Sequence, residues 1–204
     1  MLDIKKEEPS FFTRYKKKNQ PHSYQDDCDD YTLRNNLRES LLQEQKNQCF
    51  YCEKKISNDG KVHLDHLKQR YSFHKLECSY GNMVLSCNGG VKEEHCGKYK
   101  DNQESWDDNK FLKILHPNPQ LEEKVSKHFD YLSNGEIQPN QSLSQDSHKR
   151  AFNTINYLNL NHKNLIEARK NIFLQLELYK TSGFQIDKIF TYFQEFESLF
   201  KDIR

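Results

Sequence analysis

Residues 49–66 read CFYCEKKISNDGKVHLDH, and this stretch decides how the middle of the chain folds. It opens with Cys49-Phe50-Tyr51-Cys52, which brings two thiols close together, and it closes with Asp65-His66. Residues 62–65 predict a short strand, and Asn58-Asp59-Gly60 predicts the turn before it. The segment therefore carries two kinds of metal chemistry, soft thiols at one end and a carboxylate beside an imidazole at the other.

Cys87 and Cys96 complete a set of four soft ligands. Structural zinc is held by four such ligands in a tetrahedron, with one pair commonly presented by a tight knuckle. Eight residues separate Cys87 from Cys96 instead of the usual two, and Gly89-Gly90 lets that loop fold back. Four thiolates leave no position for water, so we expect a structural zinc that contributes to folding.

The composition is typical of a small fold that is held partly by metal. Of 204 residues, only 34% are apolar and 30% are charged, yet 12% are aromatic, which a disordered chain would lack. No apolar run approaches the ~20 residues that span a bilayer, and the first residues do not resemble a signal peptide. We therefore expect a cytoplasmic protein without membrane contact, whose clustered cysteines bind metal instead of forming disulfides.

Asp65 and His66 end the first expected strand, and Asn82 begins a second strand over 82–85. This order fits a phosphodiesterase that uses one divalent ion. The Asp65 carboxylate suits a hard cation such as Mg²⁺. The neutral His66 imidazole can take a proton from water near pH 7, and the Asn82 amide can hold the backbone of that histidine. An Asp-His pair alone usually lies on the surface, but its place between two cysteine pairs favours the catalytic interpretation.

The whole pattern resembles the zinc-bearing HNH endonucleases with a ββα-metal core. More narrowly, the chain resembles the HNH nuclease subunit of Septu anti-phage systems and the related retron-associated nucleases. The similarity spans nearly the full length. It is carried by KKEEP at 5–9, LLQEQ at 41–45, CFYCE at 49–53, YGNMVLSC at 80–87, HP at 116–117, LNLN at 158–161 and Arg169.

The resemblance implies a role for each motif residue. His66 is the general base, Asp65 a ligand of a catalytic Mg²⁺ or Mn²⁺, and Asn82 the positioning residue. Lys100 matches the lysine that closes the motif and is expected to meet a phosphate. The structural zinc is implied at the four cysteines, Cys49, Cys52, Cys87 and Cys96.

One position departs from the family pattern. Many HNH enzymes carry a His or Asn metal ligand directly after the last cysteine, where this chain has Gly97. His95 and Asp101 are the candidates for the missing ligand, and His95 can equally be a solvated loop histidine. His63 shares a strand face with Asp65 and either touches the site or is half-exposed.

The resemblance also implies partners. It predicts an effector subunit of an anti-phage defence complex with an ABC/SMC-like ATPase and, in retron-linked systems, a reverse transcriptase with its RNA–DNA product. Nucleic-acid affinity comes largely from neutralising phosphates. With a net charge of only +1, this chain is expected to bind DNA weakly alone and to rely on a larger partner for loading. DNA is favoured over RNA. An RNA substrate such as a tRNA, and a catalytically inactive zinc-clipped adaptor, are the alternatives.

The expected fold class is α+β, with the ββα-metal HNH core clipped by the four-cysteine zinc site, an N-terminal helix and a mainly helical C-terminal part. Three segments are expected: an N-terminal arm and helix at 1–48, the zinc-bound core at 49–116, and a hairpin plus helices at 117–204. Pro117 and Pro119 mark the linker between the last two.

Periodicity and turn signals predict the remaining elements. Residues 1–29 read as irregular, apart from the basic run at 16–18. Helices are predicted over 31–46, from near Cys96, and over 146–158, 162–181 and 186–202, with a hairpin at 126–138. The aromatic stripe of the last helix predicts packing against neighbouring helices, with a subunit interface as the alternative. Cys28 and Cys78 are expected to be free thiols and Arg169 to be structural.

Overall fold

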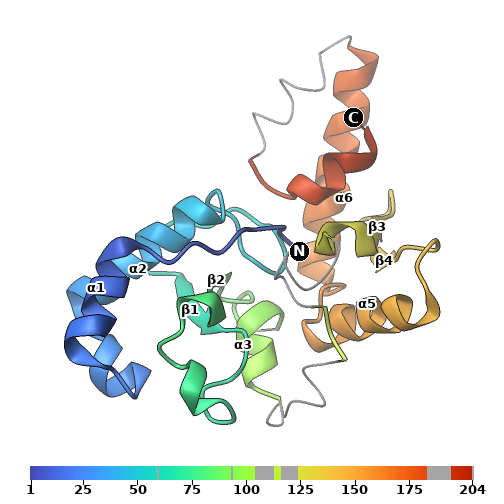
Figure 1. The fold of residues 1–204 in the computed structure, drawn as a ribbon. Helices are drawn as coiled ribbons and strands as arrows, with labels where there is room; N and C mark the ends of the chain where they lie inside the picture. The colour runs from blue at the N-terminus through green and yellow to red at the C-terminus, as the bar shows by residue number, and fades with distance from the viewer. Residues whose placement is uncertain (59, 93, 104–112, 116–123, 183–193, 204) are drawn as a thin grey trace.

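A computed structural model of the chain describes residues 1–58, 60–92, 94–103, 113–115, 124–182 and 194–203. Two small antiparallel sheets and a set of helices form an α+β fold, as predicted (Figure 1). The linker prolines Pro117 and Pro119, and residues 186–193 of the helix predicted over 186–202, lie outside the described residues. None of the helices in the described ranges is both long enough and apolar enough to cross a membrane.

The first sheet is a two-stranded hairpin followed by a short helix. Strand β1 (Val62–His66) pairs antiparallel with β2 (Met83–Cys87), and the register sets His63 opposite Ser86 and Asp65 opposite Val84. Helix α3 (Cys96–Asp101) follows and packs on β2. Figure 1 shows these three elements together, with the C-terminal elements to their right. Both predicted strands and the helix beginning at Cys96 are confirmed.

Helix α2 (Tyr31–Glu44) is capped at its N-terminus and attached to β2 at its C-terminus. The Asp30 carboxylate caps it by accepting the N–H groups of Thr32 and Leu33, and its leucines are buried. Gln45, the residue after the helix, is fully buried, and its side-chain amide exchanges hydrogen bonds with the N–H and C=O of Leu85 (2.7 and 2.9 Å). This pairing attaches the end of the helix to β2.

The prediction of an irregular N-terminal arm is wrong over one stretch, because residues Ser10–Asn19 form helix α1. The Pro9 carbonyl accepts the N–H groups of Phe12 and Thr13 and so begins the helix. Phe12 is completely buried and packs against Tyr80, with ring centroids 6.5 Å apart. Phe12 is the one buried residue of this helix, and its aromatic residues are confined to a single turn, Phe11 to Tyr15, which is too short a stripe for periodicity to detect. A π-helical turn, Tyr24–Cys28, follows it.

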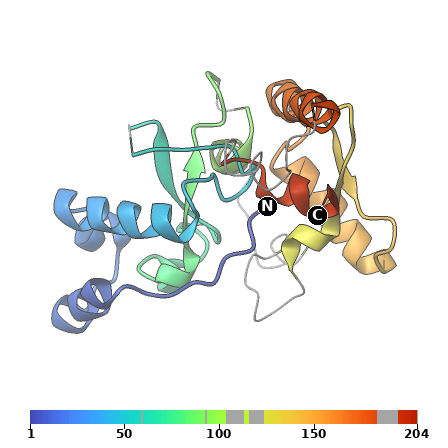
Figure 2. The same ribbon diagram turned by 90° about the horizontal axis from the view of Figure 1, so that it is seen from above.

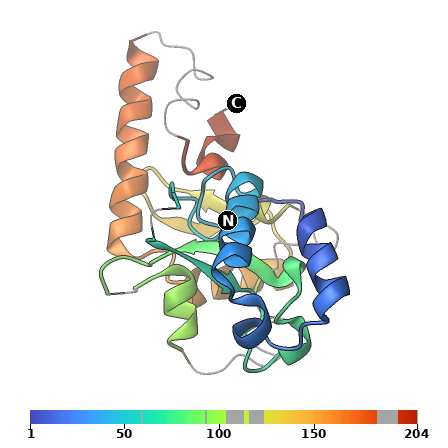
Figure 3. The ribbon, with the colours of Figure 1, turned by 90° about the vertical axis from the view of Figure 1, so that its left-hand side faces the viewer.

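The C-terminal part confirms the predicted hairpin and the two helices that follow it. Strands β3 (Phe129–Tyr131) and β4 (Ile137–Pro139) pair antiparallel, followed by α5 (Gln145–Tyr157) and α6 (Lys163–Thr181). Figures 1 and 3 show α6 rising from the body of the protein with the segment Glu197–Ile203 beside it.

Arg169 is structural, as predicted. The side chain is 1% exposed and donates to the carbonyl oxygens of Gly135 (2.6 Å) and Leu160 (2.7 Å). Gly135 has φ +89°, and a Cβ there would lie 2.2 Å from the Ile166 carbonyl oxygen, so the hairpin turn can approach α6 only with glycine. These contacts fix the hairpin to the beginning of α6.

One large hydrophobic cluster draws residues from all three predicted segments, including the α2 leucines, the residues between the first cysteine pair, β2 and the inner face of α5. Figure 2 shows these elements from above. A second, smaller cluster joins α6 to the last described segment through Phe196, Leu199 and Phe200. That segment is a 3₁₀ helix (Glu197–Ile203), not an α-helix, and its buried aromatic residues confirm intramolecular packing at these positions.

Candidate metal centres and active site

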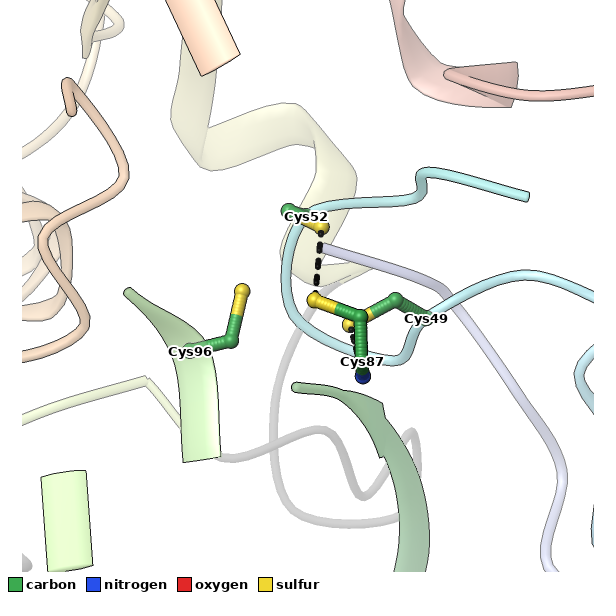
Figure 4. A group of neighbouring side chains, drawn as sticks. All are labelled: Cys49, Cys52, Cys87 and Cys96. Carbon is green, nitrogen blue, oxygen red and sulfur yellow. Dashed lines mark hydrogen bonds between the residues drawn. The ribbon is translucent and has the colours of Figure 1, made fainter. Parts of the chain in front are cut away.

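The four predicted zinc ligands, Cys49, Cys52, Cys87 and Cys96, come together and are called the cysteine cluster below. Their sulfur atoms all lie within 4.8 Å of one another, and three of the four residues are buried. Figure 4 shows the sulfurs facing one another from the knuckle, the end of β2 and the beginning of α3. The Sγ atoms of Cys52 and Cys87 are 3.8 Å apart. A tetrahedron with Zn–S bonds of about 2.3 Å has an edge of about 3.8 Å, so the cluster can hold a metal ion such as zinc.

The backbone around the knuckle is arranged for this role. The Cys49 N–H donates to the Lys54 carbonyl oxygen (2.8 Å), and the Glu53 N–H donates back to the Cys49 carbonyl oxygen (2.9 Å). The Cys87 N–H donates to Cys49 Sγ (3.3 Å) and so supports negative charge on that sulfur. The local hydrogen bonds thus form the knuckle that the Cys-x2-Cys spacing predicts.

The thiols influence one another's ionisation. Hydrogen bonds from Cys49, Cys52 and Cys96 lower the pKa of Cys87, whereas burial raises the pKa of Cys96. Thiols with raised pKa values keep their protons in the absence of a metal ion. Metal binding at the cysteine cluster would therefore release protons.

His95 lies beside the cysteine cluster. It is 3% exposed, so it is not a solvated loop histidine, and its Nδ1 atom lies 3.1 Å from Cys96 Sγ and 3.9 Å from Cys87 Sγ. Its ring also packs against His162, with centroids 5.7 Å apart. The backbone of Cys96 adopts φ +62° between His95 and Gly97. The structure thus places His95 with the sulfurs and turns the next part of α3 toward Asp65.

The second candidate centre surrounds Asp65. Ligand atoms of His63, Asp65 and Asp101 lie within 4.8 Å of one another, and these three residues are called the Asp65 group below. Asp65 is 3% exposed and accepts a hydrogen bond from the Tyr51 hydroxyl. Burial by itself would raise the pKa of Asp65, but the charges of Lys100 and His63 outweigh burial and lower it. Asp65 is therefore a carboxylate near neutral pH, the form that binds a cation.

Lys100 belongs to the interior of this site. Its side chain is 1% exposed, and Nζ donates to the carboxylates of Asp65 (3.0 Å) and Asp101 (3.0 Å) and to the His66 carbonyl oxygen (2.8 Å). We expected Lys100 to contact a phosphate, but its buried ammonium group instead contacts two carboxylates and a carbonyl oxygen of the protein. Lys100 is a buried counter-ion that orients both carboxylates.

His66 occupies a position suited to proton transfer. It is 6% exposed, and its Nε2 atom lies 2.8 Å from the Glu77 carbonyl oxygen. A carbonyl oxygen only accepts, so in the neutral ring Nε2 carries the proton and Nδ1 has the lone pair. Burial lowers the pKa of His66, which keeps the ring neutral near pH 7. The Tyr24 ring packs edge-on against it at 4.9 Å and fixes its plane.

Asn82 fixes the loop that follows His66. Its Oδ1 accepts the Lys68 N–H (2.8 Å), and its Nδ2 donates to the carbonyl oxygens of Lys68 (3.0 Å) and Leu76 (3.2 Å). Its own backbone carbonyl oxygen accepts the Leu67 N–H (2.9 Å). The Asn82 side chain is thus bonded to the backbone at two points of the loop between β1 and β2, and it holds that loop in position.

A cavity of about 600 Å³ opens onto these groups. Asp65, His66 and Asp101 contribute to its wall, together with Arg70, His74 and Glu77. The two carboxylates and the imidazole can therefore be reached from one cavity. The cysteine cluster does not line this cavity.

Tyr51 is a site residue that the sequence does not mark, and His63 and Asp101 are two whose role it leaves undecided. No spacing rule marks Tyr51, because its hydroxyl reaches Asp65 only after the knuckle has packed against β1. His63 did carry a signal, since residues two apart on a strand share a face. Cys28 and Cys78 are free thiols, as expected, and their sulfurs lie 2.8 Å apart.

No protein-family model matches the chain, and no curated protein matches it. The features of the chain that bear on its function are therefore the cysteine cluster, the Asp65 group, His66 and Asn82.

Proposed function

We propose that this protein is a metal-dependent HNH endonuclease that hydrolyses phosphodiester bonds, with DNA as the favoured substrate. The observation that carries the proposal is the hydrogen bond from His66 to the Glu77 carbonyl oxygen. It holds the imidazole in the tautomer whose Nδ1 accepts a proton, next to a buried carboxylate and at the wall of a cavity.

The order of the elements supports a ββα-metal core. Asp65 and His66 end β1, Asn82 directly precedes β2, and α3 contributes Lys100 and Asp101 to the same site. In such a core, two antiparallel strands and one helix enclose a single divalent ion. The cysteine cluster lies where the knuckle, β2 and α3 meet, which suits a structural zinc that holds these elements together.

Each residue of the site has a defined task in the proposed reaction. His66 Nδ1 takes a proton from the attacking water, a contribution of about 10²–10⁴-fold for a general base. Asp65 and Asp101 would hold a divalent cation, which when bound supplies charge stabilisation for the leaving oxygen. Lys100 keeps both carboxylates oriented. Asn82 keeps the loop after His66 in place.

The distribution of charge supports a partner that delivers the nucleic acid. The net charge of the chain is +1, and Lys100 is buried and unable to reach a phosphate. Arg70 is the single Arg or Lys among the described residues that line the cavity. We therefore extend the proposal to an effector subunit of a Septu-type anti-phage complex, loaded by an ABC/SMC-like ATPase and, in retron-linked systems, associated with a reverse transcriptase and its RNA–DNA product.

The test is cleavage by the His66→Ala variant. Supercoiled plasmid and a structured RNA are incubated with the protein and Mg²⁺ or Mn²⁺, with and without the ATPase. We expect wild type to nick the plasmid, and we expect His66→Ala to lose this activity with unchanged zinc content and circular dichroism. His22→Ala, at an exposed histidine outside the cavity, is the matched control.

The outcomes separate the alternatives. Retained nicking by His66→Ala would contradict the assignment of the base. Cleavage of the RNA but not the plasmid would move the substrate to RNA such as tRNA. No cleavage of either substrate by wild type, with the ATPase present, would favour a zinc-clipped adaptor without catalysis.

A further inference from the structure

Gly97 lies against two members of the Asp65 group. Its N–H donates to Ser86 Oγ (3.1 Å), and Ser86 is the β2 residue paired with His63. A Cβ atom placed on Gly97 would lie 2.7 Å from Asp65 Oδ2 and 3.0 Å from His63 Nε2. The space left by the missing side chain is thus bounded by a carboxylate oxygen and an imidazole nitrogen.

The backbone gives no reason for a glycine at this position. The described glycines with positive φ are Gly60, Gly89, Gly90 and Gly135, and Gly97 is not among them. Within a helix, glycine is less favourable than alanine. What a side chain at position 97 would remove is the space between His63 and Asp65.

His63 is the unsatisfied group beside this space. Both of its ring nitrogens are buried and have no hydrogen-bond partner within the described part of the chain. Leaving a buried polar group unpaired destabilises the fold, so such a group needs an explanation, and a bound ion is one. Nε2 is also the nitrogen that lies next to the position of the absent Cβ.

The surrounding charges favour a cation here. Asp65 and Asp101 carry two negative charges, Lys100 offsets one of them, and one negative charge is left beside the imidazole of His63. Lys100 occupies Oδ1 of Asp65, whereas Oδ2 lies next to Gly97. Oδ2 accepts the Tyr51 hydroxyl hydrogen through one lone pair and keeps a second lone pair for an ion. The Asp101 side chain is 41% exposed, so the group has access to solvent.

From these contacts we propose that His63 Nε2, Asp65 and Asp101 bind one divalent transition-metal ion, and that Gly97 lacks a side chain so that the ion has room. The use of this ion in cleavage rests on the proposed function, but its binding does not. One nitrogen and two oxygen ligands favour Mn²⁺ over Mg²⁺, because imidazole binds first-row transition ions well and Mg²⁺ prefers oxygen and water.

The test is Mn²⁺ binding by the full chain, loaded with zinc and free of nucleic acid, measured from the electron paramagnetic resonance signal of unbound Mn²⁺. Wild type should bind about one Mn²⁺, and Mg²⁺ should compete weakly. His63→Ala and Gly97→Ala should each weaken Mn²⁺ binding at least tenfold, since even disturbing the partner of a ligand costs about 10–100-fold. Zinc content should not change in either variant.

Two further variants control the measurement. Gly81→Ala is the matched glycine control, because a Cβ there would meet nothing closer than Ser79 Oγ at 3.9 Å and no positive φ opposes it. It should bind Mn²⁺ as wild type does. His63→Asp replaces the nitrogen with oxygen ligands, so it should retain a metal site whose preference has moved from Mn²⁺ toward Mg²⁺.

The results distinguish this inference from the proposed function. If His63→Ala and Gly97→Ala bind Mn²⁺ as tightly as wild type, the metal site proposed here is wrong, even if wild type cleaves DNA. An unchanged metal preference in His63→Asp would also contradict it. If both variants lose Mn²⁺ but wild type cleaves no nucleic acid, the metal site stands and the nuclease proposal fails.

Discussion

The cysteine cluster is built from the knuckle, β2 and α3, and the Asp65 group from the paired strand β1 and the same helix, yet the two suit different metals and different tasks. The cysteine cluster offers four soft sulfurs, three of them on buried residues, and it does not line the cavity. The Asp65 group offers a nitrogen and carboxylate oxygens, and two of its three members line the cavity. A closed set of four thiolates suits a structural ion, whereas an open set of fewer ligands leaves positions for water and substrate.

Two short connections couple these centres. Tyr51, between the first two cysteines, donates its hydroxyl hydrogen to Asp65. Cys96 contributes its sulfur to one centre, and the next residue, Gly97, borders the other. Through these connections the cysteine cluster also positions the Asp65 group. Breaking the first should disrupt both, and breaking the second should leave the first intact.

The largest effect is expected from Cys49→Ala. It removes one of the four predicted zinc ligands, and structural zinc sites bind with about 10–16 kcal/mol of free energy that is coupled to folding. We expect loss of zinc, measured by elemental analysis, together with loss of soluble folded protein and of any cleavage. Cys78→Ala is the matched control, because this half-buried cysteine lies outside the cluster. A folded, zinc-free Cys49→Ala variant would contradict the structural role.

A smaller effect is expected from Tyr51→Phe, which removes only the hydroxyl that reaches Asp65. A lost hydrogen bond to a buried charged group costs about 1–3 kcal/mol, so the free energy of unfolding in urea should fall by that amount. The zinc content should not change, because the sulfurs keep their positions. Tyr31→Phe, at a tyrosine that is 71% exposed, should change neither quantity. Loss of zinc in Tyr51→Phe would show that the two centres cannot be separated in this direction.

The smallest effect is a shift in pH dependence at His66. Burial lowers the pKa of His66, and only the neutral ring accepts a proton. The cleavage rate should therefore fall on the acidic side with a midpoint below about 6.5, the ordinary value for histidine. A midpoint at or above the ordinary value, measured at saturating metal, would contradict the buried base.

The same shift affects stability. Unfolded His66 binds a proton at a higher pH than the folded residue does, so the free energy of unfolding decreases as the pH falls from about 6.5 toward the folded pKa. The dependence should be weaker in His66→Ala and unchanged in His22→Ala, as urea unfolding at several pH values would show.

Much of the fold could be predicted from local patterns. The β1–β2 pair, the hairpin of β3 and β4, and helices α2, α5 and α6 follow from turn residues and apolar periodicity. Helix α1 could not be predicted in this way, because contacts with distant residues, such as that of Phe12 with Tyr80, hold it in place. The same holds for Gln45, whose amide pairs with the backbone of β2 forty positions along the chain.

The sequence by itself determined the ligand types: four cysteines at spacings that suit zinc, and an Asp-His pair followed by an asparagine. Only the tertiary structure decided which further side chains join each centre. His95 and Gly97 are separated by one residue, but the left-handed backbone of Cys96 lies between them, so His95 meets the sulfurs and Gly97 meets Asp65. His63 reaches the same point from β1. Spacing along a chain cannot specify such a meeting, because it depends on the packing of a helix against a strand.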